Sequence, residues 1–138
     1  MISSKLILGY VLTALVFFFV DMIWLGYVAK DLYRKHLGNF LSPEVNWKAA
    51  ILFYLLFIAG IFVFVILPAV EKNSWMRALV MGGLFGLVTY ATYDLTNLAT
   101  MAQWPVKIVI IDMLWGVVLV GTVSAAGFKI LMWLGFKP

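Results

Sequence analysis

The sequence predicts an all-α membrane protein: a bundle of four transmembrane helices with a short interfacial helix between helices one and two. Of the 138 residues, 65% are hydrophobic and only 12% are charged, and the mean hydropathy is +1.07, which is too apolar for a soluble domain. Four apolar runs are each long enough to cross about 30 Å of hydrocarbon, which takes roughly 20 helical residues. Because these runs are continuous rather than alternating, helices are favoured over the strands of a membrane barrel.

We expect a single transmembrane domain over residues 1–138. Its four helices are predicted at about 6–28, 43–70, 75–101 and 106–128. The first run is too long for a cleaved signal peptide and contains Asp21 and Trp24, so we expect it to stay in the protein. Apolar residues recur at helical spacing over about 30–40, which predicts a short helix lying at the membrane surface.

Capping residues and prolines suggest where the helices begin and end. Ser42, followed by Pro43, predicts the start of the second helix, which should end near Pro68. Ser74 is placed to cap the third helix. Three tryptophans fall at the edges of the spans, where an indole can bury its rings and keep its N–H near water: Trp47, Trp75 and Trp104.

The charges limit the partners. The isoelectric point is near 9.4, and since the basic residues lie in loops and ends we assign them to lipid phosphates rather than to nucleic acid. Arg34, Lys35 and His36 are the expected headgroup contacts. The chain has no cysteine, which excludes disulfides and thiolate metal sites. Lysine and arginine divide equally between the two sides, so orientation is undecided, and a homodimer, including an antiparallel one, stays open.

Helices one, three and four each contain one charged residue inside the apolar run, and each time it is an aspartate: Asp21, Asp94 and Asp112. An acid at this depth costs about 2.5–3.5 kcal/mol and is expected to face the protein interior. At 1.5 Å per residue, Asp21 and Asp94 lie about 13 Å and Asp112 about 7 Å below one membrane boundary. If the helices bundle, the three acids converge on one site, together with Asn97.

The neighbours of the acids supply aromatic walls. "DMIW" and "DMLW" place Trp24 and Trp115 one turn after Asp21 and Asp112. Because the two helices run in opposite directions, we expect one tryptophan above the acids and the other below. In the third helix, Tyr90 and Tyr93 lie on the stripes that contain the polar residues, whereas the threonines are expected to bond to their own helix backbone. The glycines of "GGLFG", residues 82–86, are expected to allow close helix packing.

No span contains a basic residue that could pair with the converging carboxyl groups. Three functions are compatible with such a site. The leading hypothesis is a site that binds or transports a small cationic or amphipathic ligand, linked to protons. A membrane enzyme acting on lipids, with an aspartate as general acid or base, and a structural or assembly protein stay open. No cofactor is expected. The carboxylates of Asp21, Asp94 and Asp112 would suit a hard cation such as Mg²⁺ or Ca²⁺, but no metal site is firmly predicted.

With "DMIWLG", "TYDLTNLAT", Trp104 and "IDMLWG" taken together, the chain resembles a family of small bacterial four-helix membrane proteins catalogued as a domain of unknown function. The resemblance covers nearly the whole chain and implies a multi-pass protein of the bacterial inner membrane. In size and helix number the chain also resembles the small multidrug resistance exporters. Those carry a glutamate in the first helix, whereas Asp21 lies late in its helix and two more acids accompany it, so no mechanism is carried over.

Overall fold

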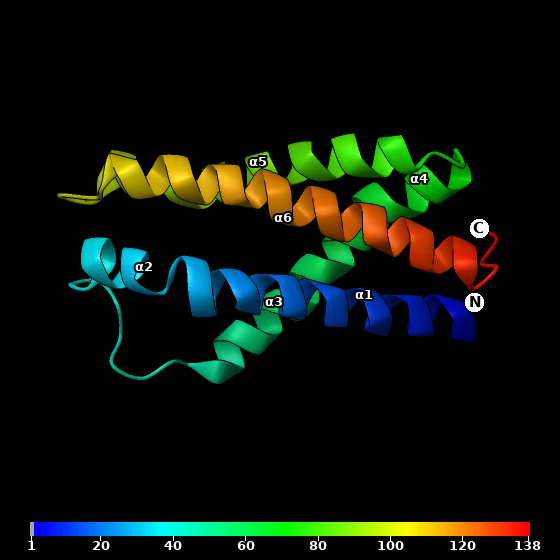
Figure 1. Ribbon diagram of the computed structural model, residues 1–138, viewed down its shortest axis with the longest axis horizontal. Coiled ribbons are helices and arrows are strands. Elements are labelled where there is room, and N and C mark those ends of the chain that lie inside the picture. The colour runs from blue at the N-terminus through cyan, green and yellow to red at the C-terminus, as the bar shows by residue number, and fades with distance from the viewer. Residues whose placement is uncertain (1) are drawn as a thin grey trace.

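A computed structural model describes residues 2–138. Four helical stretches in this part of the chain are long and apolar enough to cross a membrane, which confirms the predicted all-α membrane fold. Along the chain the elements are α1 (Ser4–Ile23), the π-helical segment η1 (Trp24–Val28), α2 (Lys30–Leu37), α3 (Trp47–Ile61), the π-helical segment η2 (Phe62–Ile66), α4 (Leu67–Glu71), α5 (Trp75–Thr100) and α6 (Val106–Trp133). Figure 1 shows both termini at one end of the bundle and α2 at the other, beside the turn from α5 to α6.

The first span changes its helical geometry at its end. The segment η1 continues α1 without a break, and the N–H of Ala29 donates to the carbonyl oxygen of Trp24 at 2.7 Å. This bond spans five residues and so closes a π-turn, a feature that often occurs at functional sites. It brings the chain from α1 directly into α2, so residues of α2 lie close to the end of the first span.

The second span begins later than predicted. It begins at Trp47 rather than at Pro43, because Asn46 provides the cap: its side chain accepts from the N–H of Ala49 at 3.1 Å. Ser42 instead forms a local turn, in which its hydroxyl donates to the carbonyl oxygen of Glu44 at 2.7 Å. The span ends at Glu71, within one residue of the predicted 70, and Pro68 lies three residues before that end.

Glycines hold α5 and α6 together, as the sequence predicted. A methyl group at Gly86 would collide with the backbone of Gly116, and one at Gly82 would lie 2.8 Å from the carbonyl oxygen of Val120. A methyl group at Gly116 would in turn collide with the ring of Tyr90. This close approach brings the aromatic side chain of Tyr90 directly against α6.

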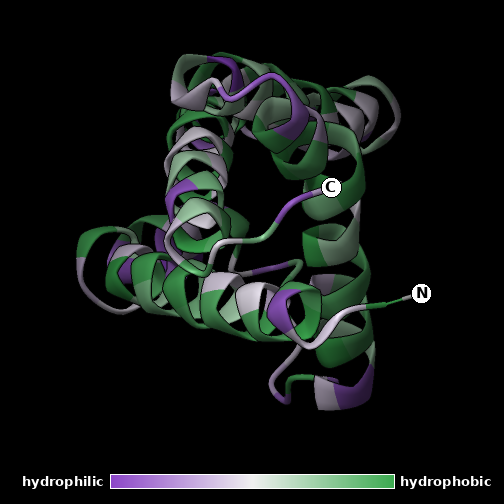
Figure 2. Ribbon diagram, turned by 90° about the vertical axis from the view of Figure 1, so that its right-hand side faces the viewer, coloured by the Kyte–Doolittle hydropathy of each residue, from purple (hydrophilic) through white to green (hydrophobic). Residues whose placement is uncertain are grey.

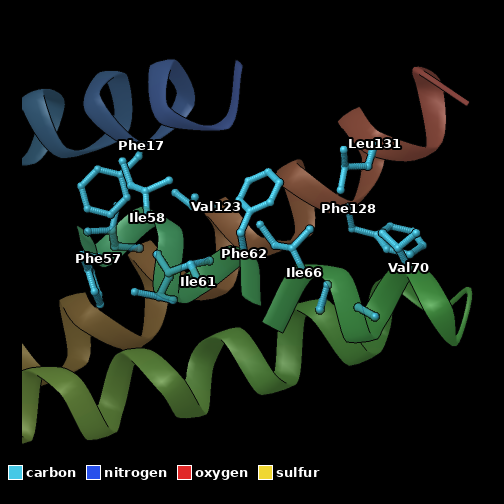
Figure 3. Close-up of a cluster of buried hydrophobic side chains, with 14 residues drawn as sticks. Phe17, Phe57, Ile58, Ile61, Phe62, Ile66, Val70, Val123, Phe128 and Leu131 are labelled. Carbon is cyan, nitrogen blue, oxygen red and sulfur yellow. The ribbon is translucent and has the colours of Figure 1, made fainter. Parts of the chain in front are cut away.

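Apolar side chains fill the half of the bundle near the termini. Figure 3 shows this core, in which Phe17 of α1 faces Phe57 and Ile58 of α3, and Val123 and Leu131 extend from α6. Figure 2, which looks along the bundle, shows helices that are predominantly hydrophobic over their length. Large apolar side chains also cover the outside, as expected for a surface that faces lipid tails. The three buried aspartates lie outside this apolar cluster.

Candidate functional site

A cavity of about 410 Å³ lies in the half of the bundle that contains α2, and all three buried aspartates line it. The aromatic residues around it come from five elements and are Trp24, Tyr33, Tyr54, Tyr90, Tyr93 and Trp115. No lysine, arginine or histidine lines the cavity. The structure thus brings together Asp21, Asp94 and Asp112 from three different helices, in a space without basic side chains.

Asp21 is buried at 5% exposure and is held by two side chains from other helices. The indole N–H of Trp115 in α6 donates to its Oδ1 at 3.3 Å, and the hydroxyl of Tyr54 in α3 donates to its Oδ2 at 3.3 Å. Both carboxyl oxygens therefore have a donor. These bonds join three of the four spans at one carboxyl group.

Asp112 is held by a residue outside the four spans. The hydroxyl of Tyr33 in α2 donates to Oδ1 of Asp112 at 2.5 Å and accepts from the indole N–H of Trp24 at 3.1 Å. Burial and the hydrogen bond to Asp112 raise the pKa of the Tyr33 hydroxyl above its ordinary value of 10.0. The hydroxyl consequently keeps its proton at neutral pH and acts as a donor to the carboxyl group.

The two D-M-x-W motifs pair crosswise. Helices α1 and α6 run in opposite directions (Figure 1), and in each motif the tryptophan follows its aspartate by three residues. An antiparallel pairing therefore places each aspartate opposite the tryptophan of the other motif. Trp115 contacts Asp21 directly, and Trp24 reaches Asp112 through Tyr33.

The same pairing corrects the expected position of the two tryptophans. Instead of forming separate walls above and below the acids, the rings of Trp24 and Trp115 stack at 4.5 Å between centroids with 7° between their planes. The pairing sets the two tryptophans only about three residues, or roughly 4.5 Å, apart along the bundle, so their rings can meet between the helices. The sequence supplied the spacing, but the prediction considered each helix by itself.

Asp94 differs from the other two acids. Its side chain is fully buried at 0% exposure, and within residues 2–138 no N–H or O–H group donates to its carboxyl oxygens; the side chain within hydrogen-bond reach is another acid, Asp112. Buried polar groups are nearly always hydrogen-bonded, and an unpaired one costs about 1–3 kcal/mol or more when charged. A buried carboxyl group that lines a cavity and lacks a donor is therefore the part of the site that most needs a partner.

The remaining predicted residues lie around the site rather than in it. Asn97 is half-buried and is not among the residues that line the cavity. Arg34 and Lys35 are exposed on α2, and Nδ1 of His36 lies 2.9 Å from the carbonyl oxygen of Leu32. The threonines of α5 act as expected, because each hydroxyl that forms a hydrogen bond donates to a carbonyl of its own helix.

Trp104 is not the surface anchor that was predicted. It is only 6% exposed, with its ring between Phe40 at 5.2 Å and Tyr93 at 5.9 Å, and among the described residues its indole N–H has no hydrogen-bond partner. The chain after α2 covers it, because Phe40 folds back against the turn that precedes α6. By contrast, Trp47 and Trp75 are exposed at 65% and 45%.

Two residues of the site were missed from the sequence, Tyr33 and Tyr54. In the sequence, Tyr33 is one of the apolar positions that predict the short helix over about 30–40. Tyr54 lies in the second span, which contains no acid. A signal was present: Tyr54 is the only hydrogen-bonding side chain within the apolar run from Ala49 to Val70, and such a group in a span needs a partner.

Comparison with known proteins identifies the family of the chain. Residues 6–129 match a family model described as a predicted membrane protein, DUF2177. No curated protein and no solved structure matches the chain. In the described part of the chain, no three acidic, histidine or cysteine side chains form a group that could hold a metal ion.

Proposed function

Because the chain belongs to the DUF2177 family of predicted membrane proteins, and the matched region contains all three aspartates, we propose that it binds a small cationic ligand inside the bacterial inner membrane. The ligand would occupy the cavity between Asp21, Asp94 and Asp112 and exchange with protons there. Binding of this kind is the first step of transport, which we propose as the physiological outcome.

One observation carries the proposal: the carboxyl group of Asp94 is fully buried, lines the cavity and, in residues 2–138, has only the carboxyl group of Asp112 within hydrogen-bond reach. A buried carboxylate without a counter-ion is strongly disfavoured, and no basic side chain lines the cavity. Either a proton or a ligand cation must therefore neutralise it. The cavity excludes anionic ligands for the same reason.

The aromatic residues favour an organic cation over a bare metal ion. Trp24 and Trp115 stack on each other, and Tyr90 and Tyr93 line the same cavity. Aromatic faces attract ammonium groups by about 0.5–2 kcal/mol, the more so when the cation is desolvated. A metal ion would require several oxygen ligands close together, whereas three of the four carboxyl oxygens of Asp21 and Asp112 already accept a hydrogen bond from an aromatic side chain.

The test uses tetramethylammonium as the probe and the full chain in lipid nanodiscs. Binding is followed by tryptophan fluorescence, since the Trp24–Trp115 pair lies in the cavity wall. We expect saturable binding to the wild type and a loss of at least about tenfold in Asp94→Asn, because removing one partner of a buried charge pair costs about 2–5 kcal/mol. Asp31→Asn is the matched control, since Asp31 is exposed on α2. Equal binding by Asp94→Asn and the wild type would overturn the proposal.

A further inference from the structure

An apolar groove adjoins the acidic cavity. It has a volume of about 470 Å³ and runs between α3 and α5. Its lining residues are Phe53, Phe57, Thr89, Tyr90, Tyr93 and Asp112. Phe53 and Tyr93 are each 55% exposed, so the groove opens on the outer surface of the bundle, where the apolar side chains face lipid.

The groove and the cavity share one boundary. Tyr90, Tyr93 and Asp112 line both. At one side of these three residues the walls are phenylalanines, and at the other they are aspartates and hydrogen-bonding aromatics. A molecule that occupied both the groove and the cavity would place an apolar portion beside Phe53 and Phe57 and a polar portion beside Asp94.

We propose that the ligand is an amphiphilic ammonium compound with a single tail, its cationic head in the acidic cavity and its tail in the groove. This inference rests on the proposed function and names its class of ligand. Charge decides between amphiphiles: an ordinary phospholipid would bring its phosphate against the carboxyl groups, where no basic side chain lines the cavity to receive it. An amphiphile without a cationic head would leave the Asp94 carboxyl group without a counter-charge.

The groove can be filled by a substitution at a residue that is not one of the three acids. Thr89 lines the groove and its hydroxyl bonds only to the carbonyl oxygens of Phe85 and Gly86 in its own helix. Thr89→Phe would fill the groove with a ring. Thr92→Phe is the matched control, because Thr92 is exposed, bonds to its own helix in the same way and does not line the groove.

The experiment compares two probes in the same nanodiscs: tetramethylammonium, which has the head alone, and dodecyltrimethylammonium, which has the head and a tail. The tail of dodecyltrimethylammonium also partitions into the lipid of the nanodisc, so tighter apparent binding of this probe to the wild type is not evidence for the groove. The evidence is the change in its affinity that each variant causes. We expect Thr89→Phe to weaken binding of the tailed probe by about tenfold and to leave tetramethylammonium within twofold of the wild type. Thr92→Phe should change neither.

The two proposals can fail separately. If the wild type does not bind tetramethylammonium, the proposed function is overturned. If it does, but Thr89→Phe weakens the tailed probe no more than Thr92→Phe does, the tail lies elsewhere and only the groove inference is overturned. Equal weakening of both probes by Thr89→Phe also overturns it, since the groove would then not be separate from the head site. Phe53→Ala, which removes one exposed wall of the groove, gives a second variant with the same expected selectivity should Thr89→Phe not fold.

Discussion

The hydroxyl of Tyr33 is expected to stabilise the fold as well as shape the site, and Tyr33→Phe removes that single atom. Two hydrogen bonds disappear with it, the one to Asp112 at 2.5 Å and the one from Trp24 at 3.1 Å. Hydrogen bonds between helices in a membrane contribute about 0.6 kcal/mol on average and up to about 1.7 kcal/mol. The loss of both should lower the free energy of unfolding by about 1–3 kcal/mol.

The assay is reversible unfolding of the purified protein in mixed micelles by titration with sodium dodecyl sulphate, followed by far-ultraviolet circular dichroism. Tyr27→Phe is the control, because Tyr27 is 86% exposed and makes no side-chain hydrogen bond in the described structure. It should change the free energy of unfolding by less than about 0.5 kcal/mol. If Tyr33→Phe is no less stable than Tyr27→Phe, α2 is not docked on the spans through this hydroxyl, and Tyr33 does not hold Asp112 in place.

Three further outcomes follow from the packing and the charges. Gly86→Ala should destabilise the protein by about 1–3 kcal/mol in the same unfolding assay, because its methyl group meets the backbone of Gly116, whereas Gly26→Ala, with open space around it, should not. Thr96→Val should leave tetramethylammonium binding within twofold of the wild type, since the Thr96 hydroxyl bonds only within its own helix. Tetramethylammonium should bind more weakly as the pH falls, because protons compete for the same carboxyl groups; titrations in nanodiscs at several pH values check this, and unchanged affinity would contradict the exchange with protons.

The sequence alone predicts the features that depend on one helix at a time. The four spans follow from length and hydropathy, and the cap at Ser74 follows from residue type. The depth of Asp21, Asp94 and Asp112 could be estimated because the rise of a helix is constant. Each of these properties depends on one helix at a time.

The contacts of Trp115, Tyr33 and Trp104 could not be predicted, because they depend on how the helices and loops pack against each other. The sequence does not contain the pairing of Trp115 with Asp21, because it depends on the register between α1 and α6. Tyr33 reaches Asp112 only because η1 directs the chain into α2 at one particular angle, and a π-turn has no clear sequence signal. Trp104 is buried by Phe40, a residue from a distant loop, so its position at the edge of a span was misleading.

The crosswise pairing of the two D-M-x-W motifs also limits how the protein can move. A slide of α1 along α6 by one turn, about 5.4 Å, would separate Trp115 from Asp21 and unstack Trp24 from Trp115 in a single step. The two helices are thus expected to move as one unit. Entry of a ligand would then depend on α2, which covers the cavity through Tyr33, or on α3, which borders the groove, and cross-links between α1 and α6 should leave access to the acids intact.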